Sequence, residues 1–188
     1  MSTNNSAAPR PSNESERTKA VLDQELDYTE THRALADLTE LAARVAGTDI
    51  SLVNLIDSYT QWSISSFGID LTQMPREESV CQYTILQDDA FEVKNLANDE
   101  RFLNRPYVTG GPGLRYYYGV PLNSDGFNLG ALCVLDRSAV ELSDTQREMI
   151  ELIAKAVVKR LELMRNVRAL QSRLRRVGHD LRSPLFRI

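Results

Sequence analysis

Residues 113–136 read GLRYYYGVPLNSDGFNLGALCVLD, and they contain two apolar runs separated by a polar turn. The runs, residues 114–122 and 129–135, are rich in aromatic and β-branched side chains, which favour strands. Residues 123–126 between them, Asn-Ser-Asp-Gly, are turn-forming. The pattern predicts a β-hairpin.

A second pair of strands is expected upstream. Residues 50–56 are apolar and β-branched, and residues 61–67 follow after a short polar turn. Residues 91–93 are expected to add a brief strand, and residues 77–86 a short helix. The short connections between strands favour an antiparallel sheet, so the fold class is predicted as α+β.

Helices are expected before and after the strand-forming region along the chain. Residues 31–46 place apolar side chains at three- and four-residue steps before Gly47, and residues 15–27 carry a weaker stripe. A longer helix starts at Ser143 and Asp144 and meets no Gly or Pro before Gly178. Residues 1–14, rich in Ser, Asn and Pro, are expected to form a disordered tail.

The long helix carries an apolar seam with a mean spacing of about 3.4 residues, which is close to the repeat of a coiled coil. The seam consists of Ile150, Ile153, Val157, Leu161, Met164, Val167, Leu170, Leu174 and Val177. We therefore expect the helix of residues 143–177 to begin as the last helix of the domain and to continue as a dimeric coiled coil, formed with a second copy of the chain. The alternative is a helix that folds back on its own domain.

Composition narrows the function classes. The net charge is −4 and the isoelectric point is near 5.3, so nucleic-acid binding is not expected. Residues 143–188 nevertheless form a basic arm, with 11 Lys and Arg against 5 Asp and Glu. No apolar run is long enough to span a membrane. With two cysteines and two histidines, neither a disulfide scaffold nor a multi-histidine metal site is expected, and the cytoplasm is the expected location.

A motif that can carry phosphate chemistry follows the long helix. Residues 179–185 read HDLRSPL. A ring nitrogen of His179 can accept a phosphoryl group, and Asp180 beside it can raise the basicity of the attacking nitrogen. The string resembles the phosphoacceptor box of sensor histidine kinases. The resemblance implies that His179 is the phosphoacceptor and Asp180 its general base. The alternative is an incidental surface histidine.

The body resembles a GAF domain of bacterial signalling proteins over about residues 28–162. Residues 99–102 (DERF), 106–108 (PYV), 113–122 and 129–136 carry the resemblance. It implies an antiparallel sheet of five or six strands flanked by helices, with a pocket on the face opposite the terminal helices. GAF domains bind cyclic nucleotides, bilins, haem, small acids or nothing at all, so the resemblance establishes no cofactor and implies at most an unknown small molecule in the pocket.

Six side chains are candidates for the ligand pocket: Trp62, Cys81, Tyr83, Tyr107, Arg115 and Tyr117. Each has an alternative as an ordinary packing residue or, for Arg115, as the partner of an acidic side chain. Cys81 lies near the position where bilin-binding relatives carry their attachment cysteine, but Gln82 stands where they have His, so no bilin is expected. Cys133, within an apolar strand, is expected to be a core residue.

The resemblances divide the chain into a tail (1–14), a GAF sensory domain (15–142), a signalling helix (143–177) and a phosphoacceptor-box fragment (178–188). We expect the sensory part of a two-component histidine kinase, with a response regulator as partner. ATP would act only through a catalytic domain absent from these residues, so this chain alone is not expected to phosphorylate itself. The alternatives are a stand-alone GAF binding and dimerisation module and a methionine sulfoxide reductase, which needs reactive thiols.

Overall fold

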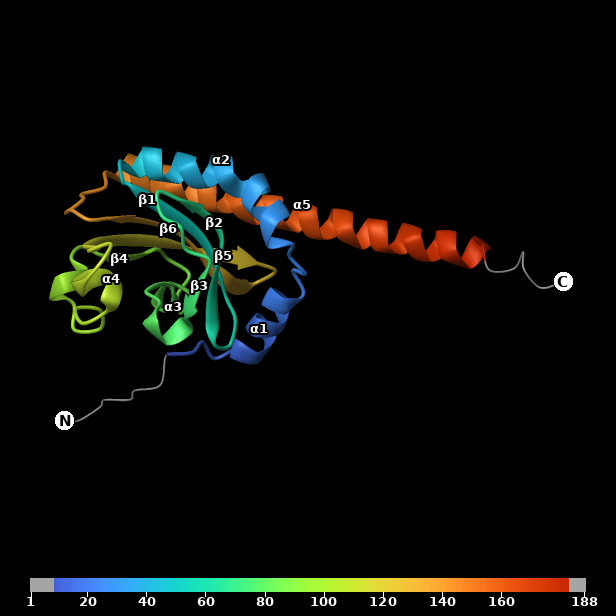
Figure 1. Cartoon of the computed structure of the whole chain (residues 1–188), viewed down its shortest axis with the longest axis horizontal. Coiled ribbons are helices and arrows are strands. Elements are labelled where there is room, and N and C mark those ends of the chain that lie inside the picture. Colours follow the sequence, from blue (N-terminus) through green and yellow to red (C-terminus); the bar gives the residue numbers. More distant parts are fainter. Residues whose placement is uncertain (1–8, 183–188) are drawn as a thin grey trace.

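A six-stranded antiparallel sheet forms the centre of the molecule, with strand order β3-β2-β1-β6-β5-β4 (Figure 1). The computed structural model describes residues 9–182, with side chains for all of these except Tyr28 and residues 178–182. The strands are β1 (Ile50–Ile56), β2 (Thr60–Phe67), β3 (Gln73–Pro75), β4 (Phe91–Val93), β5 (Tyr116–Ser124) and β6 (Phe127–Asp136). The predicted α+β class with an antiparallel sheet is confirmed.

Two long helices cover one face of the sheet. They are α2 (Tyr28–Ala46) and α5 (Asp144–Arg182), which lie side by side (Figure 1). The other face carries α3 (Cys81–Thr84), α4 (Pro106–Thr109) and the 3₁₀ turns η1 (Arg76–Glu78) and η2 (Leu96–Asn98). The remaining helix, α1 (Glu14–Leu22), packs where β1 ends and β6 begins.

Alternation along the strands produces a separate core on each face. On β1, Val53 and Leu55 belong to the core beneath α2 and α5, whereas Ile50, Leu52 and Ile56 belong to the core beneath α3 and α4. All seven residues of β1 are buried. The sheet is therefore covered on both sides, and a cavity in either layer is enclosed by its own set of helices.

Local signals explain where the long helices begin and end. The Asp27 side chain accepts a hydrogen bond from the Glu30 amide at the start of α2, and Gly47 ends that helix with a φ of 67°. At the start of α5, Ser143 and Gln146 exchange side-chain and backbone hydrogen bonds as a capping box.

The middle of the chain differs from the sequence prediction. Residues 77–86 were expected to form one helix, but the structure has η1 and α3 with an extended Ser79 between them. Strand β3 and helix α4 were not expected at all. Both are short, with three and four residues, so tertiary contacts rather than periodicity stabilise them.

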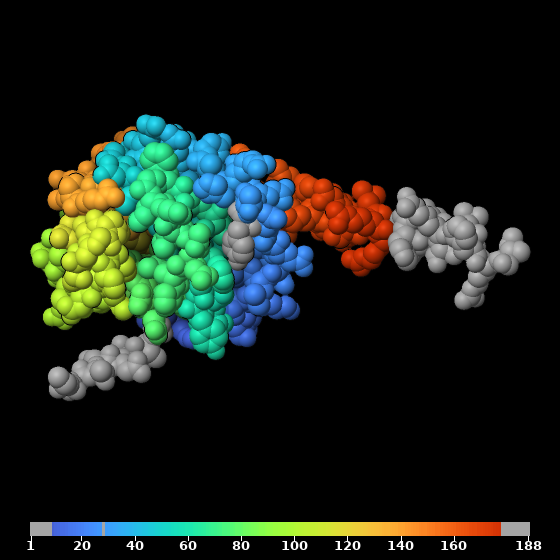
Figure 2. Space-filling view, in the orientation of Figure 1, coloured from blue at the N-terminus to red at the C-terminus, as the bar shows by residue number. Residues whose placement is uncertain are grey.

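The apolar positions of α5 fall on two faces. Leu161 is buried, and so are the three seam residues before it, Ile150, Ile153 and Val157. The exposed stripe consists of Met149, Leu152, Ala156, Leu163, Val167, Leu170, Leu174 and Val177. The single seam predicted from Ile150 onward is thus wrong in its first half, because those side chains complete the core of their own domain. After Leu161, α5 projects from the body of the domain (Figure 2).

Candidate functional site

An apolar cavity of about 270 Å³ lies on the sheet face opposite α2 and α5. We call it the sheet cavity. Strands β1 and β6 form its floor with Leu52, Cys133 and Leu135, and α3, α4 and the loop 111–114 form its walls. Its lining is mainly aliphatic, and its volume is just below the usual range for ligand sites. The cavity therefore suits a small, mostly apolar molecule.

Two short helices place polar groups at this cavity. Cys81 opens α3, where its backbone amide donates a hydrogen bond of 2.9 Å to the Ser79 hydroxyl. Tyr107 comes from α4, which begins with Pro106, and its hydroxyl donates to the Glu78 carbonyl at 2.7 Å. Burial raises the pKa of Tyr107 well above its ordinary value, so the phenol stays a neutral hydrogen-bond donor.

A cluster of four polar side chains, the thiol cluster, lies in the wall and floor of the sheet cavity. It consists of Asn54, Cys81, Tyr117 and Cys133. The Asn54 amide donates to the sulfur of Cys81 at 3.3 Å and to that of Cys133 at 3.6 Å. The Tyr117 hydroxyl donates to the Cys81 sulfur at 3.2 Å, and the two sulfurs are 3.9 Å apart.

The two thiols of this cluster differ in acidity. Burial acts to raise the pKa of Cys81, but hydrogen bonds with Cys133, Tyr117 and Asn54 outweigh it and lower the pKa to about 7. Burial raises the pKa of Cys133 well above its ordinary value, and the neighbouring Cys81 adds to that rise. These surroundings therefore favour the thiolate form at Cys81 and the protonated form at Cys133.

Three of the six predicted pocket residues line the sheet cavity: Cys81, Tyr107 and Tyr117. They come from α3, α4 and β5, so the fold brings together side chains that are far apart in sequence. Their binding of a ligand stays a prediction.

The other three predicted pocket residues lie elsewhere. Trp62 on β2 packs against the core beneath α2 and α5, and its indole donates to the Asp57 carboxylate at 2.7 Å. Tyr83 packs edge-on against Phe102. The guanidinium of Arg115 donates to three nearby backbone carbonyls of residues 108, 113 and 114, where it braces the loop before β5.

Asn54 is one of three polar cavity residues that the sequence reasoning missed, the others being Gln61 and Glu78. It is fully buried within a strand that is otherwise almost entirely apolar. Buried amides need hydrogen-bond partners, and Asn54 finds them in both sulfurs and in the Ser63 hydroxyl at 2.7 Å. A side-chain amide within a predicted strand that is otherwise largely apolar was the signal that could have identified it.

The predicted phosphoacceptor lies at the far end of α5. The backbone of His179 and Asp180 belongs to this helix, which extends to Arg182. Their side chains, and all of residues 183–188, lie outside the described part of the chain.

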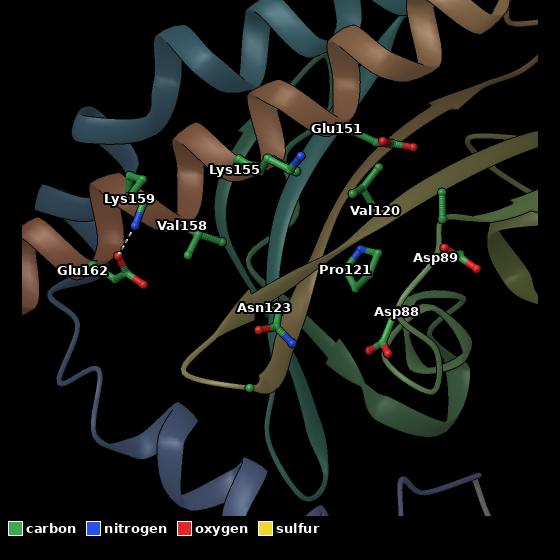
Figure 3. Close-up of a pocket in the computed structure, with 13 residues that line it drawn as sticks. Asp88, Asp89, Val120, Pro121, Asn123, Glu151, Lys155, Val158, Lys159 and Glu162 are labelled. Atoms are coloured by element: carbon green, nitrogen blue, oxygen red, sulfur yellow. Dashed lines mark hydrogen bonds and ion pairs between the residues drawn. The ribbon is translucent and has the colours of Figure 1, made fainter.

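A second hollow lies between α5 and β5 (Figure 3). Acidic residues of the loop before β4, Asp88 and Asp89, lie across from Lys155 and Lys159 on α5. Lys159 is 81% exposed and pairs with Glu162, one turn along the same helix. Because such side chains are solvated and can pair with one another, this groove is a weaker candidate than the sheet cavity.

Within the described residues, no cluster of three or more His, Cys, Asp or Glu side chains could hold a metal ion. The described helices also include none whose length and apolar character would allow it to cross a bilayer.

Comparisons with known proteins give a consistent fold. The GAF domain model matches residues 30–161. A cyclic di-GMP phosphodiesterase of Pseudomonas aeruginosa is 40% identical over 121 residues, which are 63% of this chain and 21% of that protein. The chain thus spans about a fifth of the length of that relative.

Solved structures match with low sequence identity. A free methionine-R-sulfoxide reductase from Neisseria meningitidis, in complex with its substrate, has a TM-score of 0.60 at 20% identity, covering 81% of this chain and 88% of that one. A domain of a putative two-component sensor histidine kinase from Sinorhizobium meliloti has a TM-score of 0.57 at 14% identity, covering 72% and 93%. At these identities the likeness concerns the fold alone.

Proposed function

The chain belongs to the GAF domain family, and from the HDLRSPL motif that follows this domain we propose that it is the sensory part of a two-component histidine kinase. In this proposal the sheet cavity binds a small, mainly apolar molecule, and α5 carries the resulting change to the phosphoacceptor His179. The observation that carries the proposal is the continuity of α5, which begins on the sheet and reaches the HDLRSPL motif without a break in its backbone.

One strand connects the cavity with the helix. On β5, Tyr117 lines the cavity, while Tyr116 and Tyr118 on either side of it belong to the core beneath α5. The Tyr116 hydroxyl donates to Glu92 of β4 at 2.8 Å, and Glu92 pairs with Arg147 of α5 at 3.0 Å. The Arg147 guanidinium also lies 5.1 Å from the centre of the Tyr118 ring. A ligand that moves Tyr117 can therefore change the seating of α5.

Beyond the body, α5 offers a surface for a second copy of the chain. Its exposed apolar stripe runs from Met149 to Val177, and Lys159 occupies the one position of the repeat that is not apolar. With Lys159 counted, the positions are 3.5 residues apart on average, which is the spacing of a coiled coil. An apolar stripe of this length in water favours a partner with the same stripe. We propose a parallel homodimer, in which the two copies of α5 carry both His179 backbones to the same end.

The distance along the helix supports such a relay. Leu161 is the last buried residue among the α5 side chains that the structure describes, and His179 follows it by 18 positions, or roughly 27 Å of helix at 1.5 Å per residue. A small rotation or shift of a dimeric helix persists over this length, because the paired stripes hold the register. A response regulator that takes phosphate from His179 is the expected partner of the full-length protein.

Ligand binding is tested with a panel of small apolar molecules, using thermal stability and calorimetry on the purified chain. Leu52→Phe narrows the cavity from its floor, and Leu41→Phe on the exposed side of α2 is the matched control. We expect a hit whose affinity falls at least tenfold in Leu52→Phe and is unchanged in Leu41→Phe. Binding that is equal in both variants would place the ligand elsewhere.

The phosphoacceptor is tested with the full-length gene product and ATP labelled on the γ-phosphate. We expect acid-labile, base-stable phosphate that is lost in His179→Gln. The coding sequence beyond the codon for Ile188 is expected to encode a second dimerisation helix and an ATP-binding domain. Phosphate that persists in His179→Gln, or a reading frame without those parts, would contradict the proposal.

A second candidate is a GAF binding and dimerisation module without phosphotransfer. It is favoured by one finding: the residues that line the sheet cavity all lie between Ile50 and Leu135, so the cavity is formed without His179. The similar segment of the Pseudomonas protein occurs in a protein named for a different activity, so such a domain can serve more than one output. This candidate predicts that His179→Gln leaves the response to ligand intact.

A further inference from the structure

Cys81 and Cys133 are neighbours only because of the fold. Cys81 begins α3, and Cys133 lies in the middle of β6, 52 positions later in the chain. Their sulfurs are 3.9 Å apart, and a disulfide bond is about 2.05 Å long. Closing the gap requires a movement of roughly 1.9 Å, which is within the reach of side-chain rotation combined with a small shift of the four-residue helix α3.

The surroundings give the two thiols different roles. The Cys81 sulfur receives hydrogen bonds from Asn54 at 3.3 Å and Tyr117 at 3.2 Å, and both favour the thiolate. This agrees with the pKa of about 7 for Cys81. The raised pKa of Cys133 keeps that group as a thiol. The two donors therefore favour Cys81 as the nucleophile and Cys133 as the second thiol.

Access to the pair is through the sheet cavity. Both cysteines are almost completely buried, and both line the cavity. A reagent must be small enough to enter a space of about 270 Å³ with mainly apolar walls. Hydrogen peroxide and small alkyl hydroperoxides meet this requirement, whereas bulky disulfides such as oxidised glutathione do not.

We propose that Cys81 and Cys133 form a dithiol that a small hydroperoxide, ROOH, converts into a disulfide. The Cys81 thiolate attacks the terminal oxygen, the O–O bond breaks, and ROH leaves after taking up a proton, so that Cys81 becomes a sulfenic acid. The Cys133 sulfur then attacks the Cys81 sulfur, the S–O bond breaks, and water leaves with the Cys133 proton. The two thiols together lose two electrons, and the peroxide gains them.

The disulfide would change the cavity. It draws α3 toward β6 and removes the sulfur acceptors of Asn54 and Tyr117. Tyr117 belongs to the strand whose neighbouring tyrosines contact α5. Oxidation at this site therefore reaches the same strand as a ligand would, but the dithiol chemistry does not depend on phosphotransfer or on the nature of that ligand.

The test uses the reduced full chain, treated with hydrogen peroxide or with tert-butyl hydroperoxide. Thiols are counted after unfolding, and peptides are mapped without reduction. We expect loss of both thiols and one cross-linked pair, Cys81 with Cys133, within single chains. The rate should rise with pH through about 7 as Cys81 ionises. A map without this pair, or one with disulfides only between chains, would overturn the proposal.

Variants assign the order of the steps. In Cys133→Ser we expect a sulfenic acid at Cys81 that dimedone traps, because no second thiol can displace it. In Cys81→Ser we expect Cys133 to stay reduced under the same treatment. Oxidation of Cys133 at the wild-type rate in Cys81→Ser would refute the assigned roles. Near-UV circular dichroism shows whether each Ser variant folds. If one does not, Cys81→Ala or Cys133→Ala replaces it, and the disulfide map of the oxidised wild-type chain still tests whether the two cysteines pair.

Discussion

The phenol of Tyr117 fills the space that a side chain at Gly119, two residues further along β5, would occupy. Alternate residues of a strand share a face, so the two positions are neighbours above the sheet. The absence of a side chain at Gly119 lets the Tyr117 hydroxyl reach α3, where it pairs with Thr84 at 2.7 Å and donates to Cys81 at 3.2 Å. This glycine thus allows the hydroxyl to stand at the wall of the sheet cavity.

Replacing Gly119 should therefore disturb the cavity. In Gly119→Ala the new methyl group overlaps the Tyr117 phenol, and we expect a loss of about 1–3 kcal/mol in the free energy of unfolding. Urea denaturation measures the loss. Gly111→Ala, where a Cβ meets open space, is the matched control and should change stability by less than about 0.5 kcal/mol. Equal effects of the two changes would contradict this account of Gly119.

The exposed stripe on α5 should control self-association. Leu163 is 59% exposed although Leu161, two residues earlier, is 2% exposed. We expect Leu170→Glu to weaken the dimer at least tenfold, since burying one leucine is worth about 1.5–3 kcal/mol. Sedimentation equilibrium measures the dissociation constant. Ser172→Glu, on the opposite side of the helix, is the control, and an equal loss in that variant would argue against a dimer through this stripe.

A buried ion cluster should fix α1 to the sheet. The Glu14 carboxylate contacts Arg17, which is fully buried, and Arg76, which is nearly so. Arg17 also donates to the carbonyl of Ile56 at 2.6 Å. We expect Glu14→Gln to lower the free energy of unfolding by about 3 kcal/mol, because it leaves two buried cations without their anion. Glu16→Gln, an exposed change in the same helix, should have little effect.

The contribution of Glu14 should also depend on pH. Burial acts to raise the pKa of Glu14, but hydrogen bonds from Arg17 and Arg76 outweigh it, so the folded pKa is lowered. A lowered pKa gives stability that is present above the unfolded value, about 4.3, and is lost as the pH falls through the folded value. The stability difference between wild type and Glu14→Gln should shrink in acid. A difference that grows below pH 4 would show that the sign is wrong.

The link between β4 and α5 can be measured with a double-mutant cycle. Glu92 and Arg147 are 3.0 Å apart and largely shielded from solvent, and the Tyr116 hydroxyl also donates to Glu92. We expect Glu92→Gln and Arg147→Gln to show a coupling energy of about 1 kcal/mol in urea denaturation. The exposed pair Lys159–Glu162 is the matched control and should couple by less. The relay through β5 loses its support if both cycles give the same small value.

Local pattern was sufficient for the regular parts of the fold. The strands of residues 114–135 and the helix that ends at Gly47 appear where alternation, turn residues and helical spacing placed them. It was not sufficient for β3 and α4, which have too few residues to show a period. For the candidate site, the sequence identified Cys81, Tyr107 and Tyr117 among the cavity residues but missed the polar residues Asn54, Gln61 and Glu78.

The sequence by itself determined the periods: which segments alternate, which repeat every three or four residues, and that HDLRSPL follows the long helix. Only the tertiary structure decided which partner each face received. It turned Trp62 away from the cavity, buried Ile150 in its own domain and left Leu163 exposed, and brought Cys81 to Cys133. The physical reason is that a period is a property of neighbours along the chain, whereas burial and thiol contact depend on segments that meet only when the sheet and its two layers close.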